Sequence, residues 1–489
     1  MKRFIYILLP LLITVLDSCY KDKGNYDYQP INDITAVFPS DTFRINRLDT
    51  LRITPRLSGI DTNRLAFEWR VVGVADPEQP LSIGKIVTLS TDRQFSEQIT
   101  LPAGAGYYLF DFVAIDTVTR VKYFKHLALQ VTTELQTGWM LLEQKNGGAD
   151  ISFITPTDKV IHNVYSAGNP EKPLPASARE LISIPFVGLL GTLNLVYFDG
   201  GGYKLDNTSL QVTTNYENLF YAKPEVVQPY NMLKPSPFSF GPYTFNNGKV
   251  YSLNGIYASE LFGAAFTEPD NKGTFLAPFV AGGLAYGAVF FDQANYRFLY
   301  DGGGSSTTLK VFPVNTSMAF DLNNVHKKML TMKWGLGFDF WPDNWYAIFK
   351  NENSNDCFLY TINPNGNMTT TPVAAAMQPV LNSPGIHRSP DYLFSHSVRQ
   401  MYYAADNKLY LYDMAADQSR VIYQFAEDEN ITALQLKDDA ITLATYNGNA
   451  GGGAVYVLPL AGTGDISGNV YSKKYTGFGK IIQLVFKVG

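Results

Sequence analysis

The sequence predicts an all-β protein in which an N-terminal β-sandwich is followed by a β-propeller of about seven blades. The chain is rich in residues that favour strands, with 31 Tyr and 32 Phe, and in turn residues, with 40 Gly and 27 Pro. Short alternating apolar runs are frequent, whereas few stretches carry the 3.6-residue period of a helix. Beyond residue 135, a hairpin pattern recurs at intervals of roughly 50 residues.

The first residues have the pattern of an export signal. Lys2 and Arg3 form a basic tip, and residues 4–16 are an apolar run, shorter than the ~20 residues that span a membrane. Residues 16–19 read Leu-Asp-Ser-Cys, which resembles a bacterial lipobox apart from its Asp. The resemblance implies that residues 1–18 are removed and that Cys19 carries acyl chains that hold the mature protein on a membrane. An ordinary cleaved signal or an uncleaved membrane helix is the alternative.

Composition narrows the possible partners. Removal of residues 1–18 takes away two basic residues and one acidic residue, so the formal net charge moves from −5 to −6. A mildly acidic chain without a basic run argues against nucleic acid as a partner. With Cys19 lipidated, Cys357 is the only other Cys, so no disulfide is expected. The apolar residues around Cys357 predict a buried side chain rather than a reactive thiol.

The sandwich is predicted for residues 30–134, after a polar tether at residues 19–29. Short alternating runs occupy this region, among them residues 42–45, 51–54, 66–72 and 107–116, and the last one ends at residue 132. About 100 residues of such strands are typical of one two-sheet sandwich. Trp69 lies on a central run, and we expect it to be the buried core Trp.

Three segments of this region carry a family resemblance. Residues 67–69 (Phe-Glu-Trp), 106–108 (Gly-Tyr-Tyr) and 113–116 (Val-Ala-Ile-Asp) resemble the strand pattern of PKD-type immunoglobulin-like domains. The glycine-aspartate turn that usually follows the Trp strand is missing. The resemblance implies an immunoglobulin-like fold for the sandwich.

The propeller is predicted for residues 135–489 from a repeat. Residues 196–202 (Val-Tyr-Phe-Asp-Gly-Gly-Gly) recur as residues 298–304 (Phe-Leu-Tyr-Asp-Gly-Gly-Gly), 102 positions later. Each copy lies between two apolar runs, so its glycines are expected to form a hairpin turn. If 102 residues are two units, further hairpins are expected near residues 147, 248, 355, 407 and 451. Units of this length with a central hairpin and no helix are typical of four-stranded blades, whereas β-helix coils are shorter and separate sandwiches longer.

The inner strand of each unit is expected just before its hairpin. Residues 285–292 and 431–436 are apolar runs in that position. The first hairpin lacks such a run, because the sandwich ends only a few residues earlier. Residues 481–488, the last apolar run, are therefore predicted to pair with residues 139–144 and to close the ring.

As a whole, the chain resembles the PKD-like lipoproteins of Bacteroidetes. The resemblance rests on the lipobox, on residues 19–28 (Cys-Tyr-Lys-Asp-Lys-Gly-Asn-Tyr-Asp-Tyr) and on the two domain patterns. Members of that family are surface lipoproteins, often encoded beside SusC/SusD-like outer-membrane importers, and are thought to assist nutrient capture. The resemblance therefore implies an outer-membrane lipoprotein that faces the cell exterior, with an importer as partner and a glycan or peptide as ligand.

The sequence contains no recognisable motif for catalysis, a metal or a cofactor. Its five His residues lack metal-ligand spacing, and neither a G-x-S-x-G elbow nor an Asp box occurs. Aromatic residues are the candidate ligand contacts instead. Trp341 and Trp345 flank a predicted tight turn, although core positions are the alternative for both. The remaining candidates lie on the long connections between predicted strands: Tyr216, Tyr221, Tyr230, Tyr257 and Phe262.

Two classes of function follow from these observations. The leading hypothesis is a non-enzymatic binding or scaffold lipoprotein that serves a nutrient importer. The rival is a surface hydrolase or lyase of glycans or peptides, with its site in the propeller funnel. Clustered Asp, Glu or His residues at the funnel would favour the rival, whereas a rim lined by aromatic and amide groups would favour binding.

We predict that Cys19→Ala abolishes membrane association and leaves the fold unchanged, because the acyl chains are the anchor. Membrane fractionation with a salt wash measures the first effect, and circular dichroism of the purified variant measures the second. Cys357→Ala, which keeps the lipidated residue, is the matched control and should stay with the membrane. Retention of Cys19→Ala in the washed membrane contradicts the lipid anchor.

Overall fold

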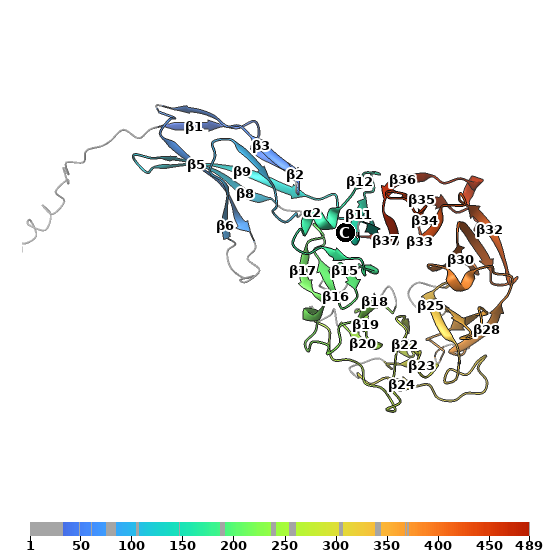
Figure 1. The fold of residues 1–489 in the computed structure, drawn as a ribbon. Helices are drawn as coiled ribbons and strands as arrows, with labels where there is room; N and C mark the ends of the chain where they lie inside the picture. The colour runs from blue at the N-terminus through green and yellow to red at the C-terminus, as the bar shows by residue number, and fades with distance from the viewer. Residues whose placement is uncertain are drawn as a thin grey trace, which may run out of the picture. The chain divides into compact units, whose positions relative to one another are not determined.

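The chain divides into two compact units, Met1–Thr132 and Thr133–Gly489 (Figure 1). The boundary predicted from the sequence, after residue 134, lies two residues later. The computed structural model describes residues 33–488 apart from residues 48, 60, 75–84, 104–106, 146, 186–190, 236–240, 254–260, 303–306, 338–343, 367, 369 and 370. The export signal and Cys19 therefore lie outside the described residues. Within the described part, no helix is long and apolar enough to cross a membrane.

The first unit is a β-sandwich. Its large sheet has the strand order β2-β9-β8-β5-β6, in which β2 runs parallel to β9 and the other neighbours are antiparallel. The remaining strands form two antiparallel pairs, β1–β4 and β3–β7. The strands are β1 Ile34–Val37, β2 Thr42–Asn46, β3 Thr50–Ile53, β4 Arg56–Gly59, β5 Leu65–Val74, β6 Lys85–Ser90, β7 Phe95–Gln98, β8 Tyr108–Asp116 and β9 Lys122–Thr132.

Trp69 lies at the centre of the sandwich core, which confirms the sequence prediction. Its side chain is fully buried, and the rings of Phe95, Phe110 and Phe112 have their centroids 4.8–5.5 Å from its ring. The indole Nε1 donates a hydrogen bond of 2.9 Å to the carbonyl of Asp92, so the one polar atom of the side chain is paired.

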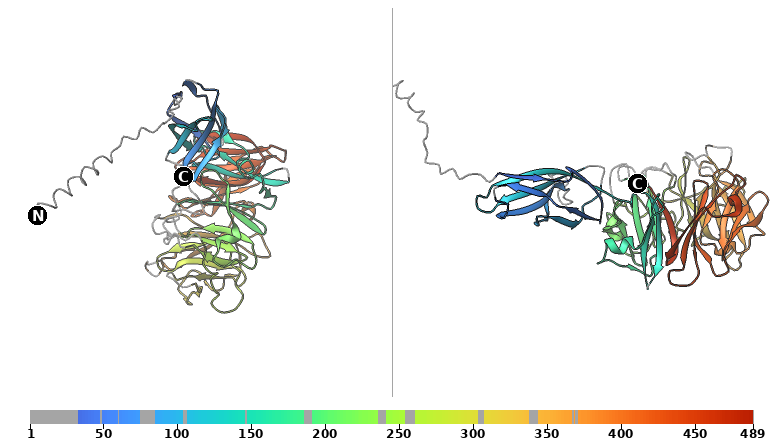
Figure 2. Two further views of the ribbon diagram at one scale, coloured as in Figure 1. Left: turned by 90° about the vertical axis from the view of Figure 1, so that its left-hand side faces the viewer. Right: turned by 90° about the horizontal axis from the view of Figure 1, so that it is seen from above.

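The second unit is a β-propeller. Its described residues form seven sheets that follow one another around a ring in Figure 1, and Figure 2 shows the same ring from two other sides. We number the sheets blades 1 to 7 in chain order. Blade 1 has the order β12-β11-β10-β37 with β13 beside β11, and blade 3 has three described strands. Strands β18, β25, β33 and β37 lie toward the centre of the ring.

Each blade consists of strands that are consecutive in the chain, except that blade 1 also contains the last strand, β37. Blade 1 consists of β10 Gly138–Lys145, β11 Gly148–Ile154, β12 Val160–Ile161, β13 Leu174–Pro175 and β37 Lys480–Lys487, with helix α2 Val164–Gly168 after β12. Blades 2 and 3 consist of β14 Glu180–Ile184, β15 Leu193–Phe198, β16 Gly201–Leu205, β17 Val212–Asn215, β18 Pro229–Leu233, β19 Tyr243–Asn246 and β20 Lys249–Ser252. Blades 4 and 5 consist of β21 Ala281–Gly283, β22 Gly287–Asp292, β23 Arg297–Tyr300, β24 Lys310–Val311, β25 Lys328–Trp334, β26 Trp345–Lys350, β27 Cys357–Ile362 and β28 Ala374–Val380. Blades 6 and 7 consist of β29 Tyr392–Phe394, β30 Gln400–Ala405, β31 Lys408–Asp413, β32 Gln418–Gln424, β33 Asn430–Lys437, β34 Ala440–Tyr446, β35 Gly453–Pro459 and β36 Lys473–Phe478.

The core of the propeller is divided among the blade interfaces. One buried apolar cluster lies between each pair of neighbouring blades, including blades 7 and 1. The side chains of successive residues in a strand therefore pack alternately against the preceding blade and the following blade. In β26, for example, Tyr346 and Ile348 pack toward blade 6, whereas Trp345, Ala347 and Phe349 pack toward blade 4. Burial on both faces explains why the second and third strands of the blades read as nearly continuous apolar runs.

The predicted closing strand is β37. It pairs antiparallel with β10, with Trp139 opposite Phe486 and Leu141 opposite Leu484. A bulge at Ile482 of β37, opposite Leu142 and Glu143, interrupts the register. The backbone amide of Gly479, just before β37, donates a hydrogen bond of 2.6 Å to the Glu143 carboxylate. Residues more than 300 positions apart thus complete blade 1, and β37 covers the inner edge of β10.

Six of the seven predicted hairpins are present, and one is wrong. The present ones join β10–β11, β15–β16, β19–β20, β26–β27, β30–β31 and β34–β35. The second Asp-Gly-Gly-Gly motif instead follows β23 and leads to the outer strand β24. The hairpin of blade 4 turns at residues 293–296, between β22 and β23. Residues 285–292, expected to be an inner strand, contain the second strand β22, and the inner strand is the short β21.

The two motifs have different roles because Asp301 is buried. Its carboxylate accepts hydrogen bonds from the backbone amide of Ala288 and from the Tyr243 hydroxyl of blade 3. Gly200 and Gly302 both have positive φ angles, 76° and 73°. The shared Asp-Gly-Gly-Gly sequence therefore predicts a local turn, but it does not predict which two strands the turn joins.

We predict that removal of residues 480–489 lowers the unfolding temperature far more than removal of residues 20–28. The first deletion takes the buried side chains of Ile481 and Leu484 out of the core, at ~1.5–3 kcal/mol each, and exposes the edge of β10. The second deletion removes only part of the predicted tether and serves as the control. Thermal unfolding of both truncated chains gives the comparison, and equal unfolding temperatures contradict closure by β37.

Candidate ligand-binding site

Two of the predicted ligand contacts are core residues. Tyr216 is fully buried in the short helix η2 Tyr216–Leu219, and Phe262 is 1% exposed. Both belong to the apolar cluster between blades 2 and 3, where the ring of Phe220 lies 5.1 Å from Tyr216 and 5.3 Å from Phe262. The prediction that these two rings meet a ligand is wrong. The connections that carry them fold back beside blade 3 and fill its interface with blade 2.

Trp345 is also a core residue, which corrects its assignment as a ligand contact. It is 5% exposed on β26, and its Nε1 donates a hydrogen bond of 3.1 Å to the carbonyl of Gly282 in blade 4. Trp341 and Tyr257 lie outside the described residues. Tyr221 is 71% exposed. Tyr230 is half-buried, with the guanidinium of Arg179 4.8 Å above its ring.

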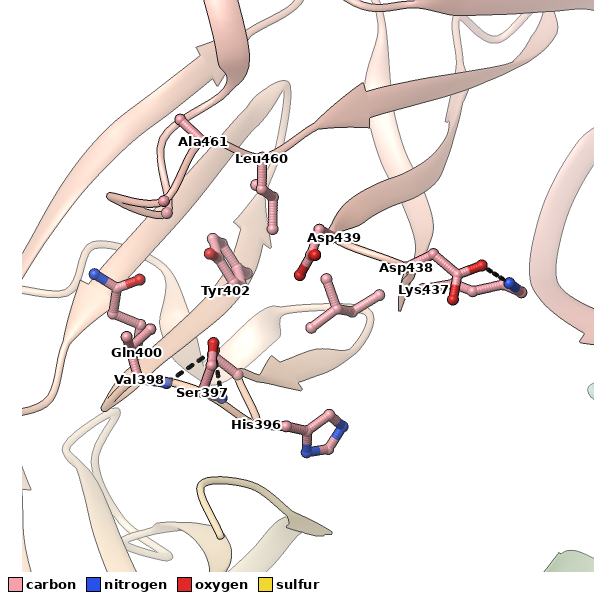
Figure 3. A pocket seen from close by; sticks show the side chains of 14 residues that line it. His396, Ser397, Val398, Gln400, Tyr402, Lys437, Asp438, Asp439, Leu460 and Ala461 are labelled. Atoms are coloured by element: carbon pink, nitrogen blue, oxygen red, sulfur yellow. Dashed lines mark hydrogen bonds and ion pairs between the residues drawn. The ribbon is translucent and has the colours of Figure 1, made fainter. Parts of the chain in front are cut away.

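A pocket that the sequence did not predict lies between blades 6 and 7. Its volume is about 530 Å³, within the 300–1,000 Å³ range of small-molecule sites. Three turns enclose it: β29–β30, β33–β34 and β35–β36 (Figure 3). Its lining consists of Ser395, His396, Ser397, Val398, Gln400, Tyr402, Leu436, Lys437, Asp438, Asp439, Leu460, Ala461, Gly462 and Gly464.

The blade 7 wall of this pocket is a two-residue hairpin turn with an unusual sequence. Lys437 pairs with Ala440, which leaves Asp438 and Asp439 as the turn, with φ angles of 47° and 54°. Such a turn favours Asn-Gly or Asp-Gly, because both central residues have positive φ. The backbone carbonyl of Asp439 accepts a hydrogen bond of 2.8 Å from Leu460, which ties the turn to the neighbouring strand.

The two turn carboxylates point in different directions. Figure 3 shows the Asp438 side chain turned toward Lys437, with which it forms an ion pair. The Asp439 side chain points toward the Tyr402 side of the pocket. Asp439 is exposed, and its carboxylate has no hydrogen bond or ion pair with any described residue.

The blade 6 wall is held by hydrogen bonds within and between blades. The Ser395 hydroxyl accepts bonds of 3.3 Å from the backbone amides of Ser397 and Val398. The Gln400 side chain donates to the carbonyl of Thr463 in blade 7 at 3.0 Å. His396 is exposed, and its ring stacks on Trp334 of blade 5 with the ring centroids 3.8 Å apart.

The protonation of two wall residues follows from their surroundings. His396 Nδ1 lies 3.1 Å from the carbonyl of Gly335, which can only accept, so Nδ1 donates and Nε2 of the neutral ring is an acceptor. Burial, the largest cause, and the carboxylates of Asp465 and Asp439 raise the pKa of Tyr402 to about 12, whereas Arg420 lowers it. The Tyr402 hydroxyl therefore keeps its proton at neutral pH.

A second polar cluster lies on the inner strands near the centre of the ring. Glu180 of blade 2 accepts a hydrogen bond of 3.2 Å from Gln483 of β37. Lys333 of blade 5 forms an ion pair of 2.6 Å with Asp391, which precedes β29 of blade 6. Burial, the largest cause, and the Asp391 carboxylate raise the pKa of Glu180 to about 7, whereas Gln483, Arg179 and Lys333 lower it.

A third cluster has the residue types of a catalytic triad without its geometry. The Ser152 hydroxyl donates to the buried carboxylate of Glu143, which also accepts from Lys145 and from the backbone of Gly479. His162 Nδ1 lies 3.5 Å from the Ser152 oxygen, and the carboxylate bonds to Ser152 rather than to the imidazole. In a catalytic triad, the imidazole of His accepts a hydrogen bond from the Ser hydroxyl, and the carboxylate accepts one from the other nitrogen of the imidazole. This cluster therefore holds β10, β11 and β37 together.

One sequence signal could have pointed to the pocket. Residues 431–436 and 441–446 are alternating runs separated by a short polar segment that contains Asp438-Asp439. A turn that keeps a carboxylate where Gly is preferred retains it at a conformational cost. The other wall residues come from blade 6, and nothing local in the sequence relates them to this turn. In the described part of the chain, no group of three or more His, Cys, Asp or Glu side chains could hold a metal ion.

Comparison with known protein families identifies the first part of the chain. Residues 19–172 match the model of the PKD-like family. This segment is a PKD-like family member. The PKD-like match begins at Cys19, includes the whole sandwich and extends into blade 1 beyond α2. It confirms the family resemblance expected from the sequence. The comparison with curated proteins gave no match.

Among solved structures, two Bacteroides proteins cover almost the whole chain. One is a Quinonprotein alcohol dehydrogenase-like protein from Bacteroides thetaiotaomicron, 13% identical, with a TM-score of 0.45 and coverage of 92% of this chain and 94% of that chain. The other is a DUF4784 family protein from Bacteroides caccae, 9% identical, with a TM-score of 0.33 and coverage of 93% and 98%. Neither similarity identifies a ligand for this chain.

The raised pKa of Glu180 predicts a pH dependence of stability. Between pH 4.5 and about 7 the folded protein binds a proton at this site that the unfolded chain has released, so the contribution is fully present below pH 4.5 and is lost as the pH rises to about 7. Glu180→Gln should remove this dependence and make the variant more stable than wild type at pH 8, by about 3 kcal/mol. Denaturant unfolding at pH 4.5 and pH 8 measures the difference.

Glu171→Gln, at an exposed position in the same unit, is the matched control for Glu180→Gln. Its stability difference from wild type should be the same at both pH values. If Glu180→Gln behaves like this control, the Glu180 carboxyl is not shielded from water in solution.

Proposed function

We propose that this protein is a lipid-anchored surface protein that binds a glycan or peptide without turnover and serves a SusC/SusD-like importer in the outer membrane. The lipobox and the family match that begins at Cys19 support the anchor and the export. The wider resemblance to PKD-like lipoproteins supports the association with an importer.

The pocket between blades 6 and 7 carries the binding part of this proposal. It offers a carboxylate, an imidazole nitrogen and a phenolic hydroxyl beside the apolar side chains of Leu436 and Leu460. A few placed polar groups on an apolar lining are typical of binding sites. The Ser395 hydroxyl is occupied by backbone amides, and no hydrogen bond joins His396 to a hydroxyl among the described residues. The pocket therefore lacks the pairing of nucleophile and base that acyl transfer needs.

A lipid anchor suits a protein of modest affinity. Two or more acyl chains hold a protein stably on a membrane. The anchor confines the protein to the plane that contains the importer, which raises the effective concentration of each partner for the other. Weak contacts with ligand and importer are then sufficient for capture and transfer.

One observation favours the rival function of a hydrolase or lyase. Glu180 lies near the ring centre with a pKa of about 7, close enough to Asp391 for the two charges to interact. A carboxyl group that titrates near neutral pH is a suitable general acid. However, Asp391 is tied to Lys333 in an ion pair, and Glu180 is not part of the lining of the pocket between blades 6 and 7.

The proposed function is tested by purification and by turnover. The lipidated protein, solubilised in mild detergent, is expected to co-purify with an outer-membrane importer, whereas Cys19→Ala is expected to lose this association. The purified protein is expected to leave glycans and peptides uncleaved over prolonged incubation. Hydrolysis by wild type that Glu180→Gln abolishes would establish the enzyme instead.

A further inference from the structure

We propose that the pocket between blades 6 and 7 binds a neutral, hydroxyl-rich saccharide, with Asp439, His396 and Tyr402 as its polar contacts. This inference rests on the proposed binding function and specifies the chemical class of the ligand. It depends on the polar groups of the pocket that the protein itself leaves unpaired.

Four polar groups of the lining have no hydrogen-bond partner among the described residues. They are the Asp439 carboxylate, His396 Nε2, the Tyr402 hydroxyl and the side-chain oxygen of Gln400. The carboxylate and Nε2 of the neutral imidazole accept hydrogen bonds, and the hydroxyl can both donate and accept. A ligand that satisfies these groups must bring several hydrogen-bond donors. Hydroxyl groups donate as well as accept, whereas ionised carboxylate, sulfate and phosphate groups only accept.

Two cationic side chains near the pocket already form ion pairs. The ammonium of Lys437 pairs with Asp438 and lies 4.3 Å above the ring of Phe486. The guanidinium of Arg420 binds both carboxylate oxygens of Asp465 at 3.0 Å. Lys437 is the one Lys or Arg side chain in the described lining, so an anionic ligand would meet the Asp439 carboxylate without an unpaired ammonium or guanidinium group of the lining to offset the repulsion.

The spread of the unpaired groups favours a saccharide over a cationic peptide. Asp439 belongs to the blade 7 turn, whereas His396 and Tyr402 belong to the blade 6 turn and strand. An ammonium group concentrates its donors at one point and would satisfy Asp439 alone. A sugar ring carries hydroxyls in several directions around its rim, so it can reach both walls. Its apolar faces can pack on Val398, Leu436 and Leu460, which also line the pocket.

The experiment compares two adjacent carboxylates of one turn. Asp439→Asn removes the unpaired charge, and Asp438→Asn removes the charge that is paired with Lys437. Asn tolerates positive φ as well as Asp does, so neither substitution strains the turn. Binding is measured by calorimetry on the lipid-free mature chain with Cys19→Ala. The probes are short neutral oligomers of glucose, mannose and galactose, sulfated and uronic-acid oligomers, and a Lys-rich peptide.

We expect a neutral oligomer to bind, with affinity lowered at least about tenfold by Asp439→Asn, because a charge-assisted hydrogen bond becomes an ordinary one. Asp438→Asn should change the affinity less than about twofold. Tyr402→Phe should also weaken binding while the unfolding temperature stays unchanged, since its hydroxyl has no protein partner. Binding of a neutral ligand should persist at high salt, whereas that of a cationic peptide should weaken.

Several results would overturn the inference. The pocket binds another class of ligand if acidic oligomers bind more tightly than neutral ones. The same conclusion follows if the peptide binds and its binding depends on Asp439. Saccharide binding that is equal in Asp439→Asn and Asp438→Asn places the site elsewhere and leaves the proposed function intact. If no probe binds while the lipidated protein still co-purifies with an importer, the protein is a scaffold and this pocket is not its ligand site.

Discussion

The propeller depends on one constraint, which is that both faces of every blade must be covered by a neighbouring blade. The apolar clusters between neighbouring blades meet this requirement only if the ring closes, because blade 1 would otherwise leave Leu141 and Ile154 without the residues of blade 7 that cover them. β37 is thus both the inner strand of blade 1 and the contact that brings the ends of the propeller together. The same constraint draws Tyr216, Phe262 and Trp345 into the core, since wedge-shaped interfaces between blades require large side chains.

Near the centre of the ring, side chains rather than strand ladders join the blades. Gln435 of blade 7 accepts from the backbone amide of Phe486, and Gln483 of β37 accepts from that of Leu181 in blade 2. Arg179 donates to the carbonyl of Pro229 in blade 3, and Lys333 binds Asp391. The described inner strands of different blades have no ladder between them, and polar side chains link them instead. The Glu180 cluster belongs to this set of links, which gives its charges a structural role.

The pocket between blades 6 and 7 is a consequence of the same architecture. The packed strands hold the blades rigidly, and the turns at their ends can then vary without loss of core contacts. Asp438 and Asp439 occupy such a turn. The β33–β34 ladder holds its two ends, and the backbone amide of Leu460 donates a hydrogen bond to the carbonyl of Asp439. A binding group placed on this rigid support needs little reorganisation when a ligand arrives. The sandwich, by contrast, has its own core around Trp69 and does not contribute to this pocket.

The sequence by itself determined the class of the fold, the position of Trp69, most of the hairpins and the closing strand, because each depends on local period and turn chemistry. Residues 481–488 could be assigned to the first blade because that hairpin lacked an inner strand. Local patterns could not show that the Asp-Gly pairs at 199 and 301 join different strands, since the same positive-φ turn serves both connections. Local patterns also could not distinguish an exposed aromatic ring from one buried between two blades, because aromatic residues of both kinds lie on connections with polar neighbours in the sequence. Only the tertiary structure decided that His396 and Asp439 share a pocket, since they come from separate blades whose spacing is set by side-chain packing between them.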